Sequence, residues 1–80
     1  MQNKYFKTTD ICLAAFLLTE NQDLKGINKD YSNRGTFLFP KTEECLNLVS
    51  IFTQMDARVE PMAYQASLKQ LKHLLYLDSK

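Results

Sequence analysis

Residues 8–20 read TTDICLAAFLLTE, and this stretch decides how the rest of the chain must be arranged. Thr8, Thr9 and Asp10 supply the hydroxyl and carboxylate groups that cap the start of a helix. Leucine and alanine then favour a helix from about residue 10 to residue 20. Its side chains are apolar nearly all round, and a helix of this kind is normally buried on more than one side. The other elements are therefore expected to pack around it.

Strand patterns precede and follow this helix. Residues 4–7 (KYFK) form a short aromatic segment whose lysines are typical of an edge strand. Residues 24–31 and 36–39 predict two further strands, joined by the polar turn at 32–35. An isolated hairpin is marginally stable, so the first strand is expected to pair with one strand of this hairpin.

Three positions in the hairpin carry more specific expectations. Gly35 is expected to give the turn a residue with positive φ. Gly26 is expected to mark a bulge or a close backbone approach. Pro40 should end the second strand because proline has no N–H for the ladder.

Two amphipathic helices complete the chain. Thr42 is a suitable N-cap, and Glu43 and Glu44 suit the first turn of a helix that runs to about Met55. Its apolar stripe is Cys45, Leu48, Val49, Phe52 and Met55. Pro61 suits the first position of a last helix that reaches Leu77. The side chains expected to point inward from that helix are Tyr64, Leu68, Leu71 and Leu75.

These elements predict one small α+β domain over residues 1–80. The order is β-α-β-β-α-α, and the expected architecture has two layers, a three-stranded antiparallel sheet packed with three helices. The apolar fraction of 45% and the charged fraction of 24% fit a globular domain with a single core.

Composition excludes several classes of function. The net charge of +1 predicts no strong general attraction to nucleic acid or to membranes. Neither a signal peptide core nor an apolar run long enough to cross a bilayer is found, which favours a cytoplasmic protein. Cys12 and Cys45 lie in apolar runs without metal-ligand spacing, so buried reduced thiols are expected, and a disulfide would require the two to meet in space.

No group of residues has the pattern of a catalytic or cofactor site. His73 is the one histidine, and no nucleophile or acid accompanies it in a known arrangement. Too few ligands exist for a structural zinc ion. We therefore expect no enzyme activity, no cofactor and no small-molecule substrate.

Three surfaces are candidates for binding. On the hairpin, basic residues stand among aromatic ones, a combination that can hold single-stranded nucleic acid, although aromatic residues on one strand face are more often core. The candidate nucleic-acid residues are Lys25, Lys29 and Arg34, extended by Lys4 and Lys7. On the last helix, a polar face typical of surface helices could follow a phosphate backbone or dock a partner; it contains Gln65, Lys69, Lys72, His73 and Tyr76.

The first helix supplies the third candidate. Cys12, Ala15 and Phe16 lie away from its main apolar stripe and are expected to be uncovered in so small a monomer. Exposed contiguous apolar surface usually marks a partner or self-association site. This face predicts a protein partner or a homodimer.

The run from Tyr5 to Leu18, YFKTTDICLAAFLL, resembles the start of an uncharacterised family of small bacterial and phage-associated domains, a domain of unknown function. A hairpin that ends in an aromatic strand like Phe37-Leu38-Phe39 and then two helices follow in that family. The resemblance implies the same β-α-β-β-α-α order and a phage or mobile-element setting. It transfers no activity and no residue role.

The leading functional hypothesis from the sequence is a non-catalytic interaction or assembly module. The alternative is a small nucleic-acid-binding regulatory domain that uses the basic and aromatic hairpin surface.

Overall fold

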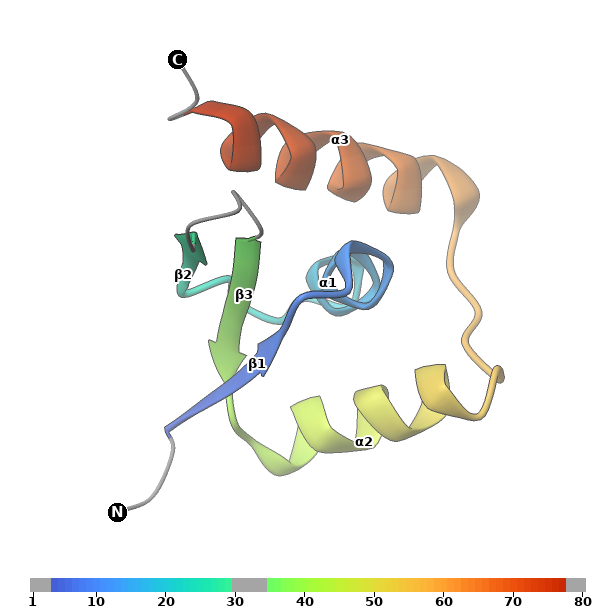
Figure 1. Cartoon of the computed structure of the whole chain (residues 1–80). Coiled ribbons are helices and arrows are strands. Elements are labelled where there is room, and N and C mark those ends of the chain that lie inside the picture. The colour runs from blue at the N-terminus through green and yellow to red at the C-terminus, as the bar shows by residue number, and fades with distance from the viewer. Residues whose placement is uncertain (1–3, 30–34, 78–80) are drawn as a thin grey trace.

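The computed structural model of the chain describes residues 4–29 and 35–77. Its elements are β1 (Tyr5–Thr8), α1 (Ile11–Thr19), β2 (Gly26–Lys29), β3 (Gly35–Pro40), α2 (Glu43–Thr53) and α3 (Pro61–Leu77). The predicted β-α-β-β-α-α order is confirmed. The sheet forms one layer and the three helices the other (Figure 1).

The three strands form one antiparallel sheet in the order β1-β3-β2. β1 therefore pairs with the second strand of the hairpin, as the marginal stability of an isolated hairpin requires. The Lys41 amide donates to the Lys4 carbonyl at 3.1 Å, which continues the β1–β3 pairing by one residue. The predicted turn at 32–34 and the predicted end of the first hairpin strand at 30–31 lie outside the described residues.

The expectations for the two glycines are wrong. Gly26 pairs opposite Leu38 in a regular register without a bulge, and a Cβ there would be in ordinary contact with the Leu38 side chain at 3.7 Å. Gly35 belongs to β3 and does not have a positive φ. A Cβ at Gly35 would instead collide with Leu75 Cδ1 and lie 3.3 Å from Ile27 Cγ2. A larger residue at this position would have to push the Leu75 side chain aside, because Leu75 near the end of α3 lies close to the strand.

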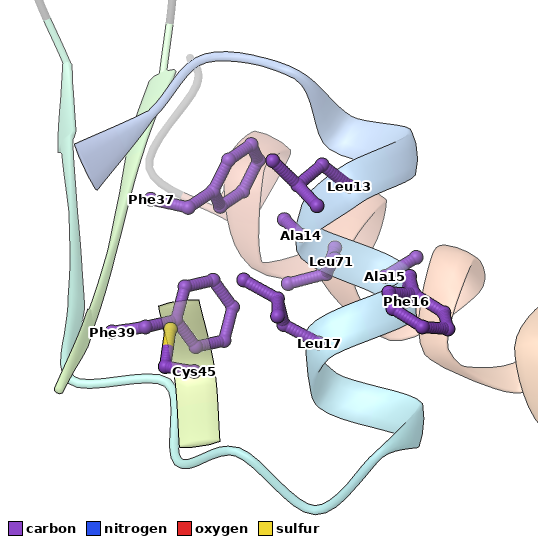
Figure 2. Close-up of a cluster of buried hydrophobic side chains, with 9 residues drawn as sticks. All are labelled: Leu13, Ala14, Ala15, Phe16, Leu17, Phe37, Phe39, Cys45 and Leu71. Carbon is purple, nitrogen blue, oxygen red and sulfur yellow. The ribbon is translucent and has the colours of Figure 1, made fainter. Parts of the chain in front are cut away.

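Helix α1 is the centre of the fold. The Asp10 carboxylate accepts from the amides of Cys12 at 2.9 Å and Leu13 at 3.4 Å, which confirms the predicted N-cap. The sheet covers one side of α1, with the Phe37 and Phe39 rings directed toward Leu13 and Leu17 (Figure 2). Because α2 and α3 flank α1 on its other sides (Figure 1), residues 13–17 of this largely apolar helix are all buried.

Helix α3 is held against α1 by apolar and polar contacts. Leu71 is fully buried, and Tyr64 and Leu68 pack against the core, as predicted. The Thr19 hydroxyl donates to the Ala15 carbonyl at 2.7 Å and shares a 2.8 Å hydrogen bond with the buried Ser67 hydroxyl.

Within residues 4–29 and 35–77, no helix combines the length and apolarity needed to cross a bilayer.

The end of α2 differs from the prediction. Met55 was expected in the apolar stripe, but it lies beyond the helix, has a φ of 63° and is 91% exposed. The Met55 amide donates to the Phe52 carbonyl, and the Asp56 amide donates to the Ile51 carbonyl, both at 3.0 Å. This is the Schellman arrangement, whose left-handed residue is usually glycine. Asn21 occupies the equivalent position after α1 with a φ of 70°.

Met55→Gly is expected to stabilise the domain by about 0.5–1 kcal/mol, because glycine adopts the left-handed conformation without the steric cost that methionine bears. Part of that gain is offset by the greater freedom of glycine in the unfolded chain. Urea unfolding measures the difference. Asn21→Gly is the matched control and should change stability less, because asparagine tolerates this conformation. A loss of stability in Met55→Gly would contradict the assignment.

Candidate interaction surface

The first-helix surface is not exposed in the single chain. Phe16 is 3% exposed and Ala15 is fully buried, so the expectation of an uncovered face at Cys12, Ala15 and Phe16 is wrong for two of its three residues. The Phe16 ring points away from the strands (Figure 2) and packs against Phe52 with centroids 5.5 Å apart. Cys12 is exposed, but the Tyr64 hydroxyl donates to its carbonyl at 3.2 Å. The prediction of an uncovered face on α1 failed because α2 and α3 pack against α1 from two sides.

The basic hairpin surface is divided between the two faces of the sheet. Lys7 stands opposite Leu38 in the β1–β3 register, and Lys29 stands opposite Gly35 in the β2–β3 register. Since side chains alternate along β3, Lys7 and Lys29 lie on opposite faces. Lys25 precedes β2 and forms an exposed ion pair with Asp23 at 4.0 Å. Lys4 is exposed beside the start of β1, and Arg34 lies outside the described residues.

The aromatic residues of the hairpin that the structure describes are not available at the surface. Phe37 and Phe39 are buried at 1% and 0% exposure, so their rings cannot stack on bases. Ile27 is half-buried and Tyr31 lies outside the described residues. For Phe37 and Phe39, the interpretation as core residues is therefore the one that the structure confirms.

The two cysteines are both free thiols, one exposed at Cys12 and one buried at Cys45. The expectation that both would be buried is therefore wrong for Cys12. Burial raises the pKa of the Cys45 thiol above its ordinary value and keeps it protonated, which makes it a poor nucleophile. Among the residues that the structure describes, His, Cys, Asp and Glu side chains do not gather in threes around any point that could hold a metal ion.

The Cys45 thiol and the Tyr64 phenol predict that the folded domain loses stability at alkaline pH. Burial raises the pKa of Tyr64 as well, with smaller contributions from Cys12 and from the nearby Asp10 charge. For Cys45 and Tyr64 alike, the folded state holds the proton more tightly than the unfolded state. The stabilisation from these two groups is therefore complete below the pKa values of the unfolded chain, which are about 9 for cysteine and about 10 for tyrosine. It is lost as pH rises through the higher pKa values of the folded state. The urea concentration at the unfolding midpoint should fall as pH rises from 8, and Cys45→Ala should make that fall smaller. A midpoint that does not change with pH would contradict this prediction.

The outer face of α3 is one of the surfaces that the described part of the fold leaves exposed. Because Leu71 and Ser67 point toward α1, residues half a turn away must point outward. Met62 is 78% exposed and Tyr76 is 63% exposed on that side. The residues that share it are Met62, Gln65, Ala66, Lys69, Lys72, His73 and Tyr76, which we call the α3 outer face. Five of these seven form the polar face predicted from the sequence.

A shallow hollow of about 390 Å³ lies on the α3 outer face, lined by Met62, Gln65, Ala66 and Lys69. Small Ala66 lies between the longer side chains, which explains the depression. The spacing i, i+3, i+4, i+7 is that of the four-residue hole that receives a side chain from a facing helix in knobs-into-holes packing. Sequence reasoning missed Met62 and Ala66, because apolar residues at the edge of a polar face do not by themselves indicate a hollow.

The α3 outer face is presented on a fixed support. Glu60 caps the helix by accepting from the amides of Met62 at 3.2 Å and Ala63 at 2.8 Å. Leu71, Ser67 and Tyr64 hold the opposite side of the helix to α1. A preformed helix of this kind loses little conformational freedom when a partner docks.

Comparison with known proteins gives a family and no function. No curated protein and no solved structure matches this chain. A family model described as "Domain of unknown function (DUF5659)" matches residues 3–77 of the 80. This agrees with the resemblance to an uncharacterised family, which covers nearly the whole chain and is most specific in the first eighteen residues; it does not show a bacterial or phage origin. The chain therefore belongs to the DUF5659 family of domains of unknown function.

Proposed function

We propose that this domain is a non-catalytic protein-interaction module that docks a partner helix on the α3 outer face. The observation that carries the proposal is the hollow of about 390 Å³ bordered by Met62, Gln65, Ala66 and Lys69. Its four-residue spacing matches the hole that accepts one apolar side chain of a facing helix. Exposed Met62 and Tyr76 supply apolar contact area, and Lys69 and Lys72 supply a polar rim.

The burial of most apolar side chains of α1 and β3 supports this choice. Leu13, Phe16, Leu17, Phe37 and Phe39 are used in the core, so they offer no contact area to a partner. Methionine adapts its shape to different neighbours, and exposed tyrosine is among the residues enriched at protein interfaces. The α3 outer face combines both on one rigid helix.

Nucleic-acid binding through the hairpin is the weaker proposal. Lys7 and Lys29 face opposite sides of the sheet, and Phe37 and Phe39 are buried, so the combined basic and aromatic surface on which it rested is absent from the described residues. Fluorescence anisotropy with single- and double-stranded DNA and RNA should show no binding at low salt. Binding that weakens steeply with salt would favour this alternative.

A photo-crosslinking amino acid placed at Gln65 tests the proposal in cells of the organism that makes the protein. We expect a defined crosslinked partner from position 65 and none from exposed Asn28 in β2. Ala66→Leu, which fills the hollow, should abolish the product. Ala63→Leu changes an exposed alanine of the same helix outside the hollow and should retain it. A product that survives Ala66→Leu, or that forms equally from both positions, would contradict docking in the hollow.

A further inference from the structure

The charge of the α3 outer face restricts what can occupy its hollow. Residues 61–77 include Lys69 and Lys72 and contain no aspartate or glutamate. Two α3 helices packed face to face would bring four lysines together without a carboxylate from either helix, and like charges brought together in an interface cost several kcal/mol. A facing helix that carries carboxylates beside an apolar side chain is therefore favoured over a second α3.

Helix α2 of the same chain has that composition. Glu43 and Glu44 lie exposed in its first turn, and Leu46 is 42% exposed three residues after Glu43. Glu43, Leu46, Ser50 and Thr53 follow the spacing i, i+3, i+7, i+10, which places them along one seam of the helix. Cys45, which is buried in the core, and Phe52, which packs on Phe16, lie on a different side. This seam, which we call the α2 seam, points away from the core.

The spacing of the charges selects one orientation. Glu43 lies about 5 Å along the axis before Leu46, and Lys69 lies about 5 Å along the axis beyond the middle of the hollow. If Leu46 enters the hollow with the two helices antiparallel, the Glu43 carboxylate comes beside the Lys69 ammonium group. In the parallel orientation the carboxylate would come beside Met62 instead.

We propose that the occupant of the hollow is a second copy of this chain, whose α2 seam packs antiparallel on the α3 outer face with Leu46 as the knob and Glu43 beside Lys69. This inference rests on the proposed function, since it assigns the partner of the same surface. The complementary charges and the matching spacing on α2 and α3 carry it.

The placement of the two helices determines the kind of assembly. α2 and α3 lie on opposite sides of α1 (Figure 1), and the residues of both surfaces are exposed, so one molecule cannot dock its own α2 seam on its own α3 outer face. A contact between different surfaces on opposite sides is head-to-tail and forms a ring or an open chain of subunits. The domain should therefore form species larger than a dimer as its concentration rises.

Sedimentation velocity over a protein concentration series tests this assembly. Wild-type protein should associate, and added salt should weaken the association because the charged pair is near the surface. Glu43→Lys and Lys69→Glu should each weaken the association at least about tenfold, because each places like charges together. An equimolar mixture of the two variants should restore it, since the introduced lysine of one variant meets the introduced glutamate of the other, and the unchanged Glu43 meets the unchanged Lys69.

Glu44→Lys is the matched control. It removes the same favourable charge from the first turn of α2, and it lies off the α2 seam, so it should leave association within about twofold of wild type. Circular dichroism verifies that each variant is folded. If the wild-type protein stays monomeric at every concentration, the proposed docking of α2 on α3 of a second copy is wrong. It is also wrong if the protein associates but neither Glu43→Lys nor Lys69→Glu weakens the association. The proposed function would still hold in that case if the crosslinker at position 65 attaches to a different protein and Ala66→Leu abolishes that crosslink.

Discussion

Phe16→Glu is expected to unfold the domain at neutral pH. Phe16 is 3% exposed and packs on Phe52, so the change removes a buried ring and forces a carboxylate into its place. Loss of a buried phenylalanine alone costs about 3–5 kcal/mol, and a buried unpaired charge costs more. A domain of this size has only about 4–12 kcal/mol to lose. Far-UV circular dichroism and urea unfolding should show a chain without a cooperative transition.

Phe16→Leu separates this explanation from an interface role. Leucine keeps the site apolar and should cost about 1–2 kcal/mol while the fold is retained. If Phe16 were instead an exposed contact residue, Phe16→Glu would remain folded and would change only the state of association. A folded, monomeric Phe16→Glu protein would therefore restore the sequence-based hypothesis and contradict the burial described above.

Leu71→Ala should destabilise the domain by about 2–5 kcal/mol. Leu71 is fully buried and carries the contact between α3 and the core around α1. The cavity left behind is bordered by Ser67 and Leu68 on the same helix, which cannot collapse into it without moving the Thr19–Ser67 hydrogen bond. The midpoint of urea unfolding measures the loss.

Met62→Ala is the matched control for Leu71→Ala, because it shortens an apolar side chain on the opposite side of the same helix. Met62 is largely exposed, so its change should stay within about 0.5 kcal/mol at protein concentrations where the chain is monomeric. Equal losses from the two substitutions would mean that α3 is not oriented with Leu71 inward.

Local signals in the sequence predicted most of the fold. The Asp10 and Thr42 caps, Pro61 at the start of α3 and the inward position of Leu71 were all predictable, because capping and helical periodicity act over a few residues. The pairing of β1 with the hairpin followed from the instability of two strands alone. These features depend on neighbours in the chain.

Features that depend on tertiary packing were not predictable. The burial of Phe16 requires α2 and α3 to lie on both flanks of α1, which no local pattern specifies. Leu75 lies close to Gly35 although it is forty positions later, and the backbone preference of glycine does not indicate that contact. The α3 face was recognised as polar, but its hollow arises from small Ala66 between longer side chains and became visible only in three dimensions.

The claim that the hollow on α3 receives α2 of a second copy is tested most directly by the methyl signal of Met62, which lines the hollow. In protein labelled with ¹³C at the methionine methyl groups, this signal should shift or broaden as the concentration rises from micromolar to millimolar. The same series with Lys69→Glu should leave it in place. A Met62 signal that stays constant in the wild-type protein across the whole series would contradict the account.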